Sequence, residues 1–79
     1  MKVVIATVSD IFFEGEVTAL TAPGSAGELT IMQNHMPLIT TLKEGTVVVR
    51  AEQIPGGVQT FPITGGVLEV HAGGATVLL

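Results

Sequence analysis

Two side chains of this 79-residue sequence could act as bases near neutral pH or as nitrogen ligands for a metal ion, His35 and His71. His71 follows Glu69 at a spacing that places both on one strand face, and a solvated face explains this pair better than a metal site. Nucleophilic catalysis would need a base and an orienting carboxylate beside a serine in one concave site. Ser9 and Ser25, the only serines, lie in no nucleophile elbow. The sequence therefore predicts no catalytic residue, no metal ligand and no cofactor.

The segment Gly24-Ser25-Ala26-Gly27 could be compared with a phosphate-binding loop. It lacks the Gly-Lys-Ser/Thr ending of a P-loop, and no helix pattern follows it that could add a dipole. These glycines are better explained as turn residues, with Pro23 fixing φ and Gly24 supplying a positive φ.

Composition limits the classes of protein to which the chain can belong. Hydrophobic residues make up 47% of the chain and charged residues 13%, against about 25% charged residues in an average soluble domain. Disordered chains have the opposite bias, and the apolar runs are far shorter than the roughly 20 residues of a membrane span. A net charge of −4 with only three lysines and arginines makes nucleic acid and anionic lipid poor partners. Such sparse surface charge favours contact with another protein.

Short β-branched segments alternate with glycine and proline at intervals typical of an all-β domain. Apolar residues do not recur at helical spacing for long enough to predict a helix. The expected strands cover residues 2–8, 15–21, 28–32, 38–43, 46–53, 58–63, 67–71 and 75–79, with a corner at 11–13. Pro62 indicates an edge strand. The prediction is one all-β domain over residues 1–79, a two-sheet sandwich rather than a closed barrel.

Strand parity separates core-facing from outward-facing side chains. Three residues of the segment 46–53 are expected to face the core: Val47, Val49 and Ala51. Four apolar residues are turned outward or stand on a connection: Met32, Met36, Ile39 and Val48. Either they form an exposed patch that meets a partner, or a second sheet covers them, and parity leaves both interpretations open.

Four motifs in collinear order carry a family resemblance: FEGEV at 13–17, APGSAGELTIMQNHMPLITTLKEG at 22–45, GGVLEV at 65–70 and ATVLL at 75–79. Together they resemble the N-terminal β-sandwich domain of the epsilon subunit of F-type ATP synthases, over essentially the whole chain. Thr30, where the family often has glycine, and Met36, where it often has alanine, are mild departures that leave the turn intact.

The resemblance implies a sandwich of about ten strands that catalyses nothing itself. It implies a place in the central stalk (rotor) of a proton-translocating ATP synthase, where the domain binds the gamma subunit and the c-ring loops in a complex that also holds alpha and beta subunits. There it would link ring rotation to ATP synthesis, peripherally on the cytoplasmic side of the membrane or its matrix or stromal equivalent, without inserting into it. Glu28 and His35 match family positions that face the c-ring, and their neighbours Ser25 and Met36 are assigned to the same interface. For gamma, we expect the outer face of 38–52, including Ile39 and Val48.

The resemblance has one large departure and leaves two alternatives. Family members often continue into a two-helix hairpin, and no such C-terminal helical domain follows Leu79 in this sequence. A biotinyl or lipoyl carrier domain of a multi-enzyme complex is also small and all-β, but it needs its prosthetic lysine at a hairpin tip, usually beside methionine. Neither Lys2 nor Lys43 fits that position. A metal-dependent enzyme, the third class, predicts bound zinc or iron.

Overall fold

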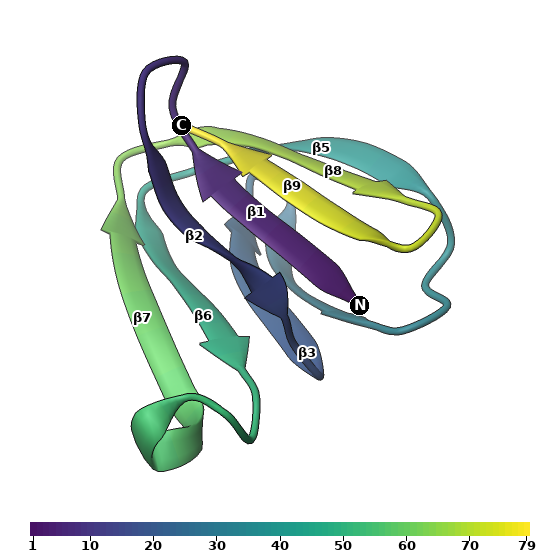
Figure 1. The fold of residues 1–79 in the computed structure, drawn as a ribbon. Coiled ribbons are helices and arrows are strands. Elements are labelled where there is room, and N and C mark those ends of the chain that lie inside the picture. The colour runs from purple at the N-terminus through teal and green to yellow at the C-terminus, as the bar shows by residue number, and fades with distance from the viewer.

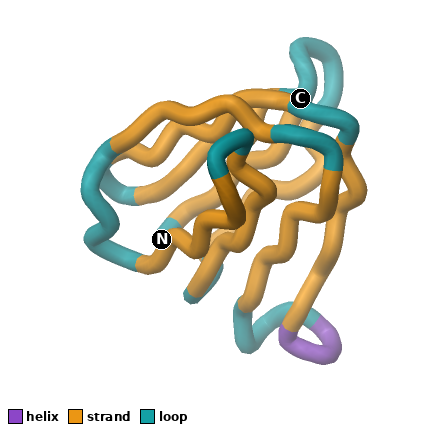
Figure 2. The backbone as a smooth tube through the Cα atoms, turned by 180° about the vertical axis from the view of Figure 1, so that it is seen from behind, coloured by secondary structure: helices purple, strands orange, loops and turns teal.

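The computed structural model describes all 79 residues and consists almost entirely of strands (Figure 1). A short 3₁₀ turn at Pro55–Gly57 is the only helical segment, and it lies at one end of the molecule (Figure 2). The nine strands are β1 (Lys2–Ala6), β2 (Ile11–Glu16), β3 (Ala19–Gly24), β4 (Gly27–Met32), β5 (Leu38–Leu42), β6 (Gly45–Arg50), β7 (Val58–Ile63), β8 (Gly66–His71) and β9 (Gly74–Leu78). None of its helical segments has the length and apolar character needed to cross a membrane.

The strands form two layers that belong to one curled sheet. The five-stranded layer has the order β2-β1-β9-β8-β5, and the four-stranded layer has the order β4-β3-β6-β7. A single residue pair, Gly24 of β3 opposite Leu42 of β5, connects the layers. All pairings are antiparallel except that of β1 with β9. The all-β sandwich expected from the sequence is confirmed, with nine strands.

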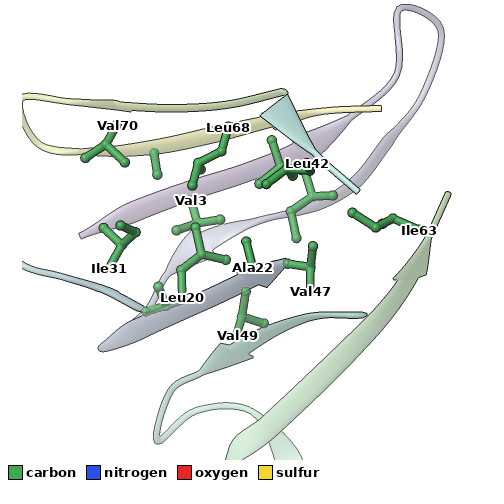
Figure 3. Packing of buried hydrophobic residues seen from close by; sticks show 14 of the residues in the cluster. Val3, Leu20, Ala22, Ile31, Leu42, Val47, Val49, Ile63, Leu68 and Val70 are labelled. Carbon is green, nitrogen blue, oxygen red and sulfur yellow. The ribbon is translucent and has the colours of Figure 1, made fainter. Parts of the chain in front are cut away.

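The core lies between the inner faces of the layers, where fifteen buried side chains form one cluster (Figure 3). Leu20 on β3 is fully buried, and its register neighbours Ile31 on β4 and Val49 on β6 are buried too. On the side where β2 and β7 face each other without pairing, the rings of Phe13 and Phe61 meet edge to face at 6.0 Å. Aromatic packing therefore closes the side that hydrogen bonds leave open.

Strand parity is confirmed along β4, β5 and β6, whereas four successive residues of β3 are buried. Val47, Val49 and Ala51 are buried as expected, because their side chains alternate toward the core while their neighbours face water. Pro62 lies on β7, which is an edge strand of the four-stranded layer, so its missing N–H leaves no ladder bond unmade.

The expected strand at 15–21 is wrong, and so is the corner at 11–13. Residues 11–13 begin β2, while the chain leaves the five-stranded layer after Glu16 and enters the four-stranded layer at Ala19. The crossing is fixed from outside the segment, because the N–H of Val17 donates to the carbonyl of Met1 and the N–H of Thr18 donates to that of Arg50. Local sequence carries no signal for these contacts. The segment 15–21 therefore resembles a single strand in its sequence, although the chain changes layers within it.

The turn after β3 also differs from expectation. Pro23 and Gly24 belong to β3, which pairs with β4 through a hairpin at Ser25 and Ala26. Gly27, not Gly24, has the positive φ, at 141°. Gly24 is required for a different reason, because a Cβ there would lie 2.6 Å from the carbonyl oxygen of Gly27.

Candidate functional site

The four residues expected to face a partner ring lie at the two ends of β4. Ser25 and Glu28 belong to the β3–β4 hairpin, whereas His35 and Met36 belong to the β4–β5 connection. All four are exposed. Glu28 and Met32 are four residues apart on β4, which separates the two ends by about 13 Å. The structure therefore presents two pairs of residues and does not gather the four into one cluster.

Of the two hairpin residues, Ser25 lies in a turn that hydrogen bonds hold in place, and Glu28 carries a carboxylate without an ion-pair partner. The N–H of Ser25 donates to the carbonyl of Thr41 at 2.9 Å, and the Ser25 hydroxyl lies 2.8 Å from the Thr41 hydroxyl. These bonds hold the hairpin against β5. Glu28 projects from β4 opposite Pro23 and forms no ion pair within the chain. Its oxygens are therefore free to accept hydrogen bonds from an external cation.

His35 and Met36 lie in a tight turn of the β4–β5 connection. The N–H of His35 donates to the carbonyl of Met32 at 3.1 Å, and Asn34 adopts a left-handed φ of 68°. Asparagine tolerates this conformation better than most residues. The side chain of Met36 is 79% exposed, so the turn presents a flexible apolar group to solvent.

The two residues expected to meet a second partner lie on different layers. Ile39 points outward from β5 in the five-stranded layer and is 72% exposed. Val48 points outward from β6 in the four-stranded layer and is half-buried between Thr21 and Thr60. One flat partner surface cannot cover both side chains, since the core separates the two outer faces.

A stripe of exposed apolar side chains crosses the outer face of the five-stranded layer, and the sequence prediction missed most of it. We define the apolar stripe by four residues, Ile11, Leu78 and Val67 in one register row and Ile39 two residues along β5 from Thr41, the residue opposite Val67. The register places Ile11, Ala6 and Leu78 side by side on β2, β1 and β9, and Val67 of β8 beside Leu78. Parity assigns each side chain to a face, but the neighbouring strands come from distant parts of the chain. The only local signal is the outward position of each residue on its own strand.

Carboxylates border the apolar stripe. Glu69 lies opposite Ile39 in the register, and Glu14 and Glu16 project from β2 on the same face. Lys2 forms an ion pair of 3.1 Å with Glu14, and the N-terminal ammonium group forms one of 3.4 Å with Glu16, whereas Glu69 has no ion pair. The face is therefore apolar along the stripe and acidic beside it.

Two observations bear on the alternative classes of function. No three histidine, aspartate or glutamate side chains gather where they could hold a metal ion. Lys43 lies on the β5–β6 connection, which passes between layers and joins strands that do not pair with each other. It is therefore not at the tip of a β-hairpin, where a carrier domain holds its prosthetic group.

The sequence matches the family model of the ATP synthase delta/epsilon chain β-sandwich domain over residues 1–79. It is 42% identical over 79 residues to the ATP synthase epsilon chain of Bordetella petrii, a match that covers 99% of this chain and 54% of that relative. The epsilon chain of Bordetella parapertussis is 39% identical with the same coverage. The chain therefore spans about half the length of these curated relatives.

Two solved structures have the same fold. One is the mitochondrial ATP synthase of Euglena gracilis, in a structure of OSCP, F1 and c-ring, with a TM-score of 0.83 and 23% identity over 96% of this chain and 48% of that chain. The other is the central stalk and c-ring of the Tetrahymena thermophila mitochondrial ATP synthase, with a TM-score of 0.79 and 23% identity over 98% of this chain and 60% of that chain.

Proposed function

The chain belongs to the family of ATP synthase delta/epsilon chain β-sandwich domains, and on that premise we propose that it is a non-catalytic central-stalk component of a proton-translocating ATP synthase. In this role it joins a gamma-type stalk subunit to the c-ring, within a complex that also contains alpha and beta subunits. It transmits ring rotation toward ATP synthesis and stays peripheral to the membrane, on the cytoplasmic side or its matrix or stromal equivalent.

The observation that carries this proposal is the apolar stripe. Single exposed hydrophobic residues are ordinary on protein surfaces, but a row that continues across adjacent strands is typical of a contact with another protein. With strands about 4.8 Å apart, the five-stranded layer offers a face about 20 Å wide. We assign this face, including Ile39, to the gamma-type partner. Val48 lies on the other layer and would belong to a separate contact.

The charges beside the apolar stripe indicate the chemistry of that partner. Glu14, Glu16 and Glu69 lie next to an apolar centre with one lysine among them. A complementary surface has an apolar centre with lysine or arginine at its rim. Rim charges act mainly on the association rate and its salt dependence, whereas the desolvated centre supplies most of the affinity.

The c-ring contact is assigned to the exposed ends of β4. The unpaired carboxylate of Glu28 can accept both N–H groups of an arginine in a polar ring loop, and Ser25 holds the hairpin that carries it. His35 and Met36 offer a second, less charged contact at the opposite end of the strand.

Binding of the purified chain to the gamma-type subunit of the same complex tests the proposal. Ile39→Lys places a charge on the assigned face, and we expect it to weaken binding at least about tenfold. The matched control is Val58→Lys, because Val58 is also an exposed apolar residue but lies on the four-stranded layer. Equal loss of binding in both variants, or in neither, would refute the assignment of the face.

The c-ring contact has its own test. Glu28→Lys reverses an exposed charge, so we expect an unchanged β-sheet circular dichroism spectrum but weaker coupling between ATP hydrolysis and proton pumping in the reconstituted complex. Glu52→Lys, an exposed carboxylate on the β6–β7 connection, is the charge-matched control. If Glu28→Lys pumps protons as the unmodified complex does, Glu28 does not bind the ring.

A further inference from the structure

The sulfur atoms of this chain all belong to its three methionines. The sequence has no cysteine, tryptophan or tyrosine, so the methionine thioethers are its most oxidisable side chains. Met36 is 79% exposed and Met32 is 59% exposed, whereas the side chain of Met1 is only 4% exposed and packs against the core. Because oxidation by a small peroxide follows exposure, two of the three sulfur atoms are open to it and the third is protected.

The two exposed methionines lie on either side of one turn. Met32 is the last residue of β4, and Met36 belongs to the β4–β5 connection. The N–H of His35 donates to the carbonyl of Met32 at 3.1 Å, and Nδ1 of His35 lies 2.8 Å from the carbonyl oxygen of Met36. These contacts use the backbone of the methionines, and neither side chain belongs to the core cluster. The turn should therefore keep its shape when the sulfur atoms are oxidised.

The reaction of a thioether with hydrogen peroxide is a balanced transfer of one oxygen atom. A lone pair of the sulfur attacks one peroxide oxygen, so that an S–O bond forms as the O–O bond breaks. The hydroxide that leaves takes the proton of the transferred oxygen and becomes water. The sulfur is oxidised by two electrons and the peroxide is reduced by two. Methionine sulfoxide, the product, has a polar, chiral group where the side chain was flexible and apolar.

We propose that Met32 and Met36 form a reversible peroxide-modification site, and that the sulfoxide of Met36 weakens docking of the β4–β5 connection on its partner. The second part rests on the proposed c-ring contact, to which Met36 contributes an exposed apolar group. The modification acts on the free chain, because a partner seated on the connection would cover Met36. A sulfoxide oxygen that loses water without gaining a hydrogen-bond donor disfavours the contact, and enzymatic reduction of the sulfoxide restores it.

The first experiment treats the tag-free chain with dilute hydrogen peroxide and follows each methionine by tandem mass spectrometry. We expect Met32 and Met36 to gain one oxygen atom each at least about tenfold faster than Met1, in keeping with their exposure. The far-ultraviolet circular dichroism spectrum should not change at that stage, since neither reacting side chain belongs to the core. Oxidation of Met1 at the same rate as the other two, or loss of the β-sheet spectrum before Met1 reacts, would overturn the proposed site.

The second experiment measures rebinding of the chain, oxidised only at Met32 and Met36, to an ATP synthase complex from which this chain has been removed. We expect binding to weaken at least about fivefold, and to recover after treatment with methionine sulfoxide reductases of both stereospecificities. Met36→Leu is the matched control, because leucine is apolar and of similar size but has no sulfur, so peroxide should leave its binding unchanged.

The outcomes separate this inference from the stalk role. Equal loss of binding in Met36→Leu and in the unmodified chain after peroxide, or no loss in either, would overturn the effect assigned to Met36. Failure of the untreated chain to rebind would instead contradict the stalk role itself. The oxidation pattern of the free chain does not depend on that role, because it follows from the exposure of the three side chains.

Discussion

Replacement of Leu20 by alanine tests whether the two layers share one core. Leu20 is fully buried, with Ile31 and Val49 as its register neighbours, and belongs to the cluster in Figure 3. The substitution removes three carbon atoms, worth about 2.4 kcal/mol of transfer free energy, and leaves a cavity that raises the cost to about 3–5 kcal/mol. A 79-residue domain has a free energy of unfolding of about 4–12 kcal/mol. The variant is therefore expected to lose a large part of its stability.

Urea unfolding followed by far-ultraviolet circular dichroism measures this loss, because the chain has no tryptophan or tyrosine for a fluorescence assay. With a slope of about 1 kcal/mol/M, the midpoint should fall by about 3 M or the variant should be unfolded without urea. Ile31→Val, with an expected cost of about 0.5–1.5 kcal/mol, keeps the test quantitative in the second case. Ile39→Ala is the exposed control and should change stability by no more than about 0.5 kcal/mol.

Two outcomes would contradict the shared core. If Leu20→Ala shifts the midpoint by less than about 1 M, the side chain is not packed as described. If Ile39→Ala costs as much as Leu20→Ala, the assignment of inner and outer faces is wrong.

Three further substitutions probe backbone geometry and surface charge. Gly74→Ala should weaken the β1–β9 pairing and lower stability by about 1–3 kcal/mol in the same urea assay, since its Cβ would overlap the backbone of Lys2. Asn34→Val should cost about 1–2 kcal/mol because Asn34 has a φ of 68°, whereas Asn34→Gly should be tolerated; equal stability of the two variants would contradict the left-handed turn. Glu14→Gln, which removes the exposed ion pair with Lys2, should shift the urea midpoint by less than about 1 M, and a larger shift would show a buried role for that pair.

Local sequence was sufficient wherever a strand has one buried and one solvated face. The alternation in β6 located Val47 and Val49 in the core, and the proline of β7 marked an edge. The break between β2 and β3 was missed because its hydrogen bonds come from Met1 and Arg50, far away in the sequence. Tertiary contacts decided that boundary against local propensity.

The candidate site was also predictable only in part: the exposure of its residues followed from the sequence, but their relative positions did not. Exposure of Glu28, His35 and Met36 followed from strand parity and from a polar connection, and the structure agrees. That these residues fall at two ends of β4, and that Ile39 and Val48 face away from each other, depends on how the layers are arranged. The local sequence does not indicate how the two layers are arranged, so the relative positions of these residues could not be predicted from it.

Strand pairing, rather than composition, gathers exposed apolar side chains on the outer face of the five-stranded layer. Ile11 and Leu78 come from nearly opposite ends of the chain, and each is unremarkable as a single exposed side chain. The parallel pairing of β1 with β9 brings them to either side of Ala6, and the β8–β9 hairpin adds Val67. The outer face of the other layer instead carries a polar row of Thr30, Thr21 and Thr60 interrupted by Val48, and its exposed apolar residues Met32 and Val58 lie apart on its two edge strands. Because the two faces differ in this way, a partner that buries apolar surface gains more on the five-stranded layer, and the domain has a preferred orientation in any assembly it joins.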